Sequence, residues 1–175
     1  MHILITGAAG SGTSTLAQAV ALCNPARVLE SDDFFWRPTN SPYQEKFGAE
    51  ERAAALLTAV RASGETVVAG AVIGWGHELE HAFDLVVFLY LPTDIRVARL
   101  RRREELRFGK ADPEFLDWAA QYDAGTAEGR TLARHREWLR HVTCSVLCLE
   151  RDESVDERLK QVLLARDAII RAKHS

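Results

Sequence analysis

The sequence predicts an α/β domain of three layers, in which helices cover both faces of a parallel, five-stranded sheet. Short apolar runs alternate along the chain with longer segments of helical periodicity, a pattern typical of strand–helix–strand units. The run over residues 85–91 is apolar throughout, as a strand buried on both faces of a parallel sheet requires. A glycine-rich turn joins the first strand directly to the first helix.

Each predicted strand is a short run of apolar or β-branched residues. These runs cover residues 3–5, 28–29, 66–69, 85–91 and 146–149. One-sided apolar periodicity predicts helices over about 16–20, 49–62, 93–107, 113–124 and 129–141, and a capping box at Ser154–Glu157 opens a last helix. The carboxyl ends of parallel strands meet at one edge of a sheet, so we expect the chemistry in the loops that follow the strands.

One domain accounts for residues 1–175. The composition is 47% hydrophobic and 27% charged, which allows a full core and excludes disorder. A formal net charge of −3 gives no general attraction for nucleic acid. No apolar run could span a membrane, and no signal peptide is evident. Three cysteines without a disulfide or zinc spacing predict small core residues and reduced thiols in a cytoplasmic protein: Cys23, Cys144 and Cys148.

The loop after the first strand fits the phosphate-binding pattern G-x4-G-K-[ST], except that Thr13 replaces the lysine. Its glycines let backbone N–H groups surround a phosphate, and the following helix adds its dipole. We expect Ser14 to offer its hydroxyl to Mg²⁺. The residues expected to bind the phosphates of ATP are Gly7, Ala8, Ala9, Gly10, Ser11, Gly12, Thr13, Ser14 and Thr15.

Thr13 leaves two functions open for this loop. Removal of a transition-state donor comparable to the lysine costs about 3–4 kcal/mol. Either another cation supplies the charge, or the protein binds a nucleotide without transferring phosphate. A third alternative is an NAD(P)-binding turn of the dehydrogenase type, with Glu30 or Asp32 as its acidic residue. Thr13 also stands where that turn requires its third glycine.

Two further segments complete a resemblance to a known family. Residues 31–38 read SDDFFWRP, and the strand over residues 86–91 runs through Pro92 into an arginine-rich helix. With residues 7–15, they resemble the P-loop kinases of small metabolites, with adenylate kinase as the broad type. The Asp-Asp-Phe-Phe segment is most similar to nicotinamide riboside and uridine kinases. The resemblance spans residues 1–110 and implies the P-loop NTPase fold, ATP and Mg²⁺ as cofactors, and phosphoryl transfer to a small metabolite.

The resemblance also implies roles for two carboxylates after the second strand. Asp32 would accept the proton of the substrate hydroxyl or hold a Mg²⁺-bound water, and Asp33 would lie in the substrate site. Alternatively, both residues cap a helix or turn. The third strand ends at Ala69-Gly70-Ala71, where the riboside kinases carry an acidic residue, so the sequence departs from the family there as well as at Thr13.

Arginines of the helix over residues 93–107 could supply the missing charge. Arg99 and Arg103 share one helix face, and the family places arginines that clamp the phosphoryl group in this region, before a lid. We therefore expect Arg99 and Arg103 to be catalytic and a short lid to cover about 104–113. The alternative is a solvated face paired with Glu104 and Glu105.

A substrate-binding insert is expected over about 32–62. Arg37 and Arg52 could pair with a phosphate of the acceptor, or could be surface charges. Trp75, which two glycines flank after the third strand, could line the pocket. The aromatic residues of the insert could stack on a base or cover the core: Phe35, Trp36, Tyr43 and Phe47.

The segment His77–His81 matches the H-E-x-x-H motif of zinc proteases. Too few residues separate Trp75 from the strand near residue 85 for a long helix, and no third zinc ligand is evident. We therefore expect a short polar connector. The expected partner of the protein is a small-molecule acceptor, with neither nucleic acid nor membrane, and the apolar pattern predicts no exposed interface.

Overall fold

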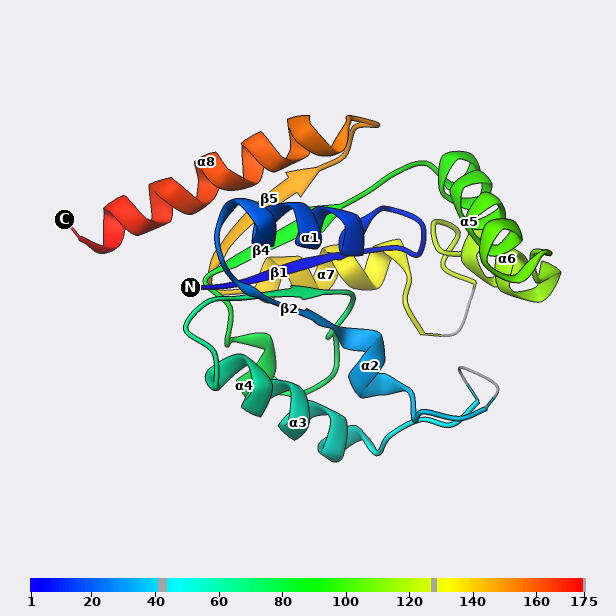
Figure 1. Cartoon of the computed structure of the whole chain (residues 1–175), viewed down its shortest axis with the longest axis horizontal. Helices are drawn as coiled ribbons and strands as arrows, with labels where there is room; N and C mark the ends of the chain where they lie inside the picture. Colours follow the sequence, from blue (N-terminus) through cyan, green and yellow to red (C-terminus); the bar gives the residue numbers. More distant parts are fainter. Residues whose placement is uncertain (41–43, 127–128, 175) are drawn as a thin grey trace.

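Five parallel strands form the centre of the computed structural model, which describes residues 1–40, 44–126 and 129–174. The strands are β1 (His2–Gly7), β2 (Arg27–Glu30), β3 (Thr66–Ala69), β4 (Leu85–Leu89) and β5 (Ser145–Leu149). They lie in the order β2-β3-β1-β4-β5, and every neighbouring pair is parallel. The predicted five-stranded parallel sheet is confirmed (Figure 1).

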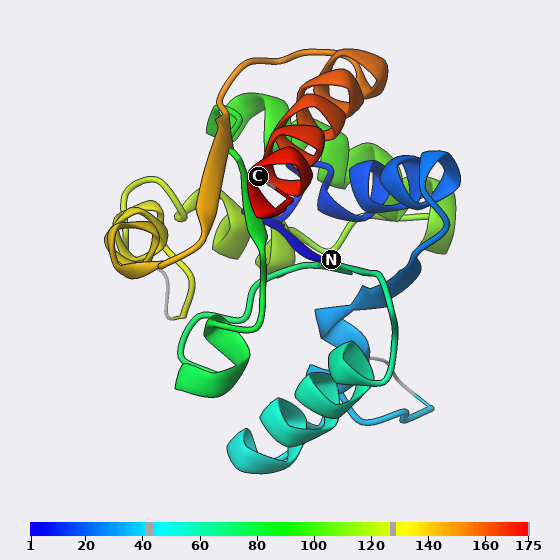
Figure 2. The same cartoon turned by 90° about the vertical axis from the view of Figure 1, so that its left-hand side faces the viewer.

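Helices enclose this sheet. They are α1 (Thr13–Cys23), α2 (Ser31–Phe35), α3 (Ala49–Arg61), α4 (His77–Glu80), α5 (Thr93–Phe108), α6 (Pro113–Ala120), α7 (Leu132–His141) and α8 (Val155–Lys173). α1 and α8 cover one face of the sheet, and α3, α4 and α7 cover the other (Figure 2). The α5–α6 pair lies beyond the carboxyl ends of the strands (Figure 1). The predicted three layers are therefore confirmed.

Alternation along β1 shows how the two cores form. Ile3 and Ile5 pack toward α1 and α8, and Leu4 between them packs toward α3 and α7. A separate small core joins α5 to α6 through Leu100 and Leu116. Every residue of β3 and β4 is buried, as their apolar runs predict.

Several boundaries differ from the sequence prediction. The fourth strand ends at Leu89, and the helices predicted over 113–124 and 129–141 cover only Pro113–Ala120 and Leu132–His141. Gly129 has φ of 93°, a value that no α-helix contains, so α7 cannot begin there. The short helix α2 was not predicted.

The segment predicted as a lid forms the tight connection between α5 and α6. α5 continues to Phe108, Gly109 ends it in the left-handed conformation, and α6 begins at Pro113 behind its Asp112 cap. Its movement as a lid stays a prediction. In the predicted substrate insert, residues 41–43 lie outside the described residues, and Tyr43 is among them.

All three cysteines are free, as expected. Their assignment to the core is wrong for Cys23 and Cys148, which are exposed. Cys148 lies on β5, which is an edge strand of the sheet and is covered less completely than the central strands. In the described ranges, no helix is both long and apolar enough to cross a membrane.

The sheet order decides against the dinucleotide-binding alternative. In that fold, β2 lies directly beside β1. Here β3 pairs with β1 on one side and β4 pairs on the other, with Ile3 opposite Val67 and Leu85. The NAD(P)-binding prediction is therefore wrong at the level of the fold.

The glycine-rich loop lies against β4 and α5 at contact distances that exclude a side chain. A Cβ atom on Gly7 would lie 2.4 Å from the carbonyl oxygen of Leu89. A Cβ atom on Gly10 would lie 2.6 Å from the carbonyl oxygen of Arg96 and 3.0 Å from Cγ of Leu100. Gly10 also has φ of 83°. The position of α5 thus sets the position of the loop.

A buried polar chain connects the end of β1 to the segment after α6. Thr6 Oγ1 lies 3.2 Å from His135 Nε2, and Tyr122 Oη lies 2.9 Å from His135 Nδ1. All three residues are buried. A neutral imidazole can donate at one nitrogen and accept at the other, so it satisfies both hydroxyl groups. Burial, with a smaller contribution from Arg130, lowers the pKa of His135 to about 4.

We expect Gly10→Ala to lower the free energy of unfolding by about 1–3 kcal/mol, because the new Cβ meets the α5 backbone and φ is positive. Chemical denaturation measures this change. Gly64→Ala is the matched control, since a Cβ atom there meets nothing within 4 Å. Equal effects of the two substitutions would contradict the close approach.

We expect His135 to make the folded state sensitive to acid. The folded pKa of about 4 lies below the ordinary 6.5, so the unfolded chain binds the proton first. Stability is therefore complete above pH 6.5 and falls toward pH 4, by about 2 kcal/mol between pH 7.5 and 5.

His135→Gln should remove the loss of unfolding free energy between pH 7.5 and 5 that His135 causes, whether or not the substitution also changes stability at neutral pH. Unfolding free energies of both proteins at pH 7.5 and 5 measure it. His81→Gln replaces an exposed histidine and should behave as wild type. An unchanged pH slope in His135→Gln would show that this group does not cause the acid sensitivity.

Candidate functional site

The loop between β1 and α1 presents free backbone donors. Gly12 is the N-cap of α1, no side chain caps the helix, and no acidic residue lies in its first turn. Among the described residues, no acceptor is found for the N–H groups of residues 12–15. These N–H groups and the helix dipole favour an anion at this position. Phosphate binding by residues 7–15 stays a prediction.

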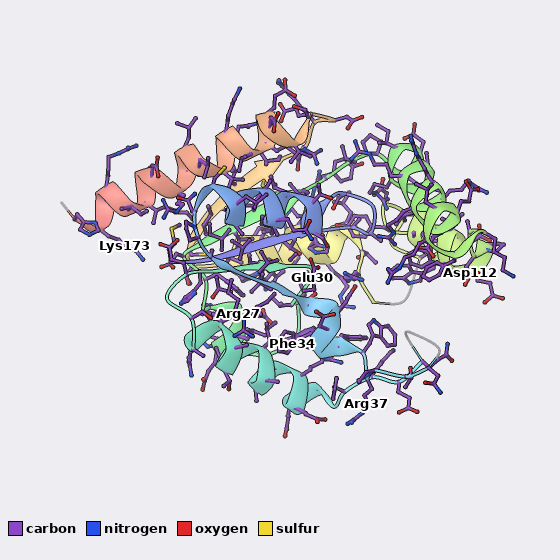
Figure 3. The ribbon with its side chains drawn as sticks, in the orientation of Figure 1. Arg27, Glu30, Phe34, Arg37, Asp112 and Lys173 are labelled. Atoms are coloured by element: carbon purple, nitrogen blue, oxygen red, sulfur yellow. The ribbon has the colours of Figure 1, made fainter. Side chains whose placement is uncertain are left out.

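Ser14 and Glu30 form a hydroxyl–carboxylate pair next to this loop. Ser14 Oγ donates a hydrogen bond to Glu30 Oε2 at 2.9 Å. Glu30 is the last residue of β2 and lies between α1 and α2, far from Lys173 at the opposite end of the molecule (Figure 3). Burial raises the pKa of Glu30, and the charges of Asp32 and Asp33 raise it further, against the effect of the Ser14 hydrogen bond.

Glu30 is predicted from the sequence only as the acidic residue of the dinucleotide alternative, and Ser14 and Asp32 are the predicted metal ligands. The sequence feature that could have indicated Glu30 as a site residue is its position at the carboxyl end of the second strand. Asp32 and Asp33 lie in the first turn of α2 with exposed side chains. The cap of α2 is Glu30, and no side chain caps this helix, so neither aspartate serves as the cap.

Gly70, which follows the third strand, stands where a side chain would meet α2. Its φ is 115°, and a Cβ atom there would lie 2.0 Å from Ser31 Oγ. Ser31 is buried at the start of α2. A larger residue at position 70 would displace the helix that carries Asp32 and Asp33.

The two arginines predicted to be catalytic both lie in surface ion pairs. Arg99 Nη2 is 2.6 Å from Asp152 Oδ1, and Arg103 Nη2 is 3.1 Å from Glu104 Oε1. The alternative predicted a pair between Arg103 and Glu104, which the structure contains, although the Glu104 side chain is only 13% exposed. The catalytic roles of Arg99 and Arg103 remain predictions.

Arg96, which was not predicted as a site residue, is the fully buried arginine of α5. Its acceptors are the carbonyl oxygens of Leu91, Ala9 and Ala119 and the side chains of Thr93 and Asp123. Arg96 therefore connects the glycine-rich loop with both helices of the α5–α6 pair. Its position four residues before the buried Leu100 places it on the inward face, a signal that the sequence contains.

A second buried arginine reaches the loop from α8. Arg158 Nη1 donates to the carbonyl oxygen of Ser11 at 3.0 Å, and Nη2 donates to that of Arg151 at 2.7 Å. The side chain is 4% exposed, and Nε has no hydrogen-bond partner among the described residues. Ser11 and Arg158 are 147 positions apart, and no sequence pattern relates them.

The predicted substrate residues Phe35, Arg52 and Trp75 come together below α2. The Arg52 guanidinium lies 4.5 Å from the centre of the Phe35 ring and 5.0 Å from that of Trp75. These rings are stacked with centroids 6.0 Å apart. Arg52 has no hydrogen-bond acceptor for its side chain in the described part of the chain, and its Nε is buried. This guanidinium is thus oriented by aromatic faces and can still bind an anion.

Arg37, by contrast, is already paired. Its Nη2 donates to Glu51 Oε2 at 3.1 Å, and its guanidinium lies 4.5 Å from the centre of the Phe47 ring. Of the two predicted arginines, Arg52 is therefore the better candidate for binding an acceptor.

The H-E-x-x-H segment holds the loop that carries Trp75. Glu80 accepts hydrogen bonds from the N–H of Gly74 at 2.8 Å and from Trp138 Nε1 at 2.6 Å. α4 has four residues, and the exposed rings of His77 and His81 stack at 3.9 Å. No metal-ligand cluster occurs in the ranges that the structure describes. The predicted connector is confirmed.

A small cavity between the glycine-rich loop and α6 was not predicted. Its lining residues come from the loop, from α6 and from the segment after α6: Ala8, Ala9, Trp118, Ala119, Tyr122 and Arg130. The Arg130 guanidinium lies 5.8 Å from the centre of the Trp118 ring. The buried chain through His135 thus ends at Tyr122, beside this cavity.

Several solved kinases share the fold at low sequence identity. A gluconokinase from Sinorhizobium meliloti 1021 is 19% identical, with a TM-score of 0.61 over 99% of this chain and 97% of that chain. A deoxyadenosine kinase from M. mycoides with bound dATP is 12% identical, with a TM-score of 0.63 over 95% and 100%. A shikimate kinase from Acinetobacter baumannii is 17% identical, with a TM-score of 0.58 over 93% and 90%. The chain therefore has the P-loop kinase fold.

No family model matches the chain. A protein of Bacillus subtilis (strain 168), the uncharacterized protein YqaC, is 38% identical over 172 residues. The match covers 93% of this chain and 95% of the relative. Identity at this level, along nearly the whole length of both chains, shows common descent. The chain therefore belongs to the same family as YqaC.

Proposed function

We propose that the protein is an ATP-dependent phosphotransferase that acts on a hydroxyl group of a small metabolite. One observation carries the proposal: the Ser14–Glu30 pair lies beside a glycine-rich loop whose backbone donors have no acceptor among the described residues. The loop suits phosphate and the pair suits a metal ion, and both lie at the carboxyl edge of the sheet. The kinase fold supports this assignment.

The residues present fit Mg·ATP. Residues 7–15 would hold the phosphates through backbone N–H groups, since glycines at positions 7, 10 and 12 keep side chains out of the cradle. Ser14 and Glu30 would hold Mg²⁺ through oxygen atoms, directly or through water. A bound Mg²⁺ would neutralise phosphate charge. The raised pKa of Glu30 indicates that a nearby cation would stabilise its carboxylate.

Asp32 provides the base on the acceptor side. Its exposed carboxylate lies in the first turn of α2, next to Glu30. It would accept the proton of the acceptor hydroxyl, whose oxygen then forms the new bond to the γ-phosphorus. The bond from that phosphorus to the bridging oxygen breaks, and ADP leaves. Asp33 would contact the acceptor.

The cluster of Arg52, Phe35 and Trp75 suits an acceptor with an anionic group. Arg52 can form a charge-assisted bidentate pair with a carboxylate or phosphate, because its guanidinium is held by Phe35 and Trp75 and not by an acidic side chain. Nucleoside monophosphates and sugar acids both carry such a group.

A nucleotide-binding protein without transfer activity is the second candidate. Thr13 and the surface ion pairs of Arg99 and Arg103 favour it, because these residues place no cation in the loop. The two candidates differ in one measurement. Mg·ATP binding without ADP release in the presence of any acceptor would select the second.

We expect ADP release from Mg·ATP to depend on one acceptor pool and to fall by about 10²–10⁴-fold in Asp32→Asn, because the base is lost. The pools are nucleoside monophosphates, nucleosides, sugar acids and other small alcohols. ATP affinity should remain that of wild type. Asp33→Asn is the matched neighbour and should raise KM for the acceptor more than it lowers kcat. Unchanged turnover in Asp32→Asn would exclude its role.

We expect Arg52→Ala to raise KM for the acceptor by about 10–100-fold, since a charge-assisted hydrogen bond contributes about 1.5–3 kcal/mol. KM for ATP should not change. Steady-state kinetics with the identified acceptor measure both values.

Arg61→Ala is the control for Arg52→Ala. Arg61 lies on the same helix, α3, where its exposed side chain pairs with Glu78. The assignment fails if Arg52→Ala leaves KM unchanged, or if the enzyme prefers uncharged acceptors.

A further inference from the structure

Two buried arginines contact the glycine-rich loop from its outer side. Arg158 Nη1 donates to the carbonyl oxygen of Ser11 at 3.0 Å, and Arg96 Nη1 reaches the carbonyl oxygen of Ala9 at 3.5 Å. These carbonyl groups flank Gly10. One arginine belongs to α8 and the other to α5, so the loop lies between two cations from distant parts of the chain.

The charge of Arg158 is only partly compensated inside the protein. Arg96 pairs with Asp123 at 3.2 Å, whereas no carboxylate lies within ion-pair distance of Arg158 in the described residues. The Arg158 side chain is 4% exposed, and its Nε has no acceptor there. A buried guanidinium without an ion-pair partner is costly, so a negative charge bound nearby would stabilise it.

The position of Arg158 lets this charge act on a phosphate in the loop. Nη1 is 3.8 Å from the place of a Cβ atom on Gly12. The carbonyl of Ser11 and the N–H of Gly12 belong to one peptide group. A cation on the oxygen polarises that group and makes the N–H a stronger donor. Arg96 has the same relation to the peptide group between Ala9 and Gly10, at a longer distance.

We infer that Arg158, assisted by Arg96, supplies from the outer side of the loop the positive charge that Thr13 cannot provide. Arg158 is a positioning residue, since it acts on the phosphates through the peptide group of Ser11 and Gly12. Arg99 and Arg103 do not take this role, because each already pairs with a carboxylate, Arg99 with Asp152 and Arg103 with Glu104. The inference rests on the proposed function, in which the loop holds the phosphates of ATP.

The test compares the dissociation constants of Mg·ATP, measured by calorimetry, for the wild type and matched variants. Arg158→Met should weaken binding by about 10-fold, less than the loss of a direct hydrogen bond to a charged group would cause, because Arg158 acts through the peptide group. Arg158→Lys should retain most of the affinity, because it keeps the charge. Lys160→Met removes a charge from an exposed position of the same helix and should bind ATP as wild type does.

A lysine at position 13 separates an electrostatic role from a structural one. Thr13→Lys should raise ATP affinity more in the Arg158→Met background than in the wild type. In that background the loop lacks the positive charge of Arg158, and the new lysine replaces it. A purely structural tie between α8 and the loop predicts equal gains in both backgrounds. Should Arg158→Met not fold, Arg158→Gln removes the charge and keeps an amide donor, and the same cycle applies.

The outcomes distinguish this inference from the proposed function. Wild-type affinity in folded Arg158→Met, or equal gains from Thr13→Lys in both backgrounds, overturns the role of Arg158 and leaves the phosphotransferase proposal standing. Absence of Mg·ATP binding by the wild type overturns the proposed function, and the inference falls with it. Weakened binding that Thr13→Lys restores supports both.

Discussion

The close approach of α5 to Gly10 determines the geometry of the loop and of the helices around it. No side chain fits between the two backbones, so each holds the other in place. Arg96 extends this contact, since the same side chain binds the loop, the end of α6 and Asp123. A displacement of α5 would therefore move the loop, α6 and the segment containing Tyr122 together. The α5–α6 pair is thus mechanically connected to the place where a nucleotide would bind.

Charges of opposite sign are separated around the loop. Glu30, Asp32 and Asp33 lie at the end of β2 and in α2, and the arginines Arg96 and Arg158 lie behind the loop. Burial and the two aspartates raise the pKa of Glu30, whereas burial and Arg99 lower the pKa of Arg158. Binding of a cation beside Glu30 and an anion in the loop would oppose both shifts. A divalent metal ion with a polyphosphate supplies these two charges together.

Local patterns predicted features whose cause lies within a few residues. The alternation of Ile3, Leu4 and Ile5 and the apolar run of β4 sufficed for a buried parallel sheet, which is confirmed. The short spacing after Trp75 sufficed to reject a zinc helix at residues 77–81. Helix ends were less predictable, since the positive φ of Gly129 excludes this residue from α7 and composition does not show that angle. Arg99 and Arg103 were selected by their common helix face, although the buried Leu100 marks Arg96 as the inward arginine.

The sequence by itself determined the class of fold, the glycine-rich loop with its threonine, and the carboxylates after the second strand. These features depend on periodicity, on glycine and on residue spacing, which are local properties. Only the tertiary structure decided which charges meet the loop. Ser14 binds Glu30 because β2 ends beside α1, and Arg158 reaches Ser11 from 147 positions away because α8 packs beside α1. The burial of Arg158 and its hydrogen bond to Ser11 depend on contacts between distant segments, and no local pattern specifies them.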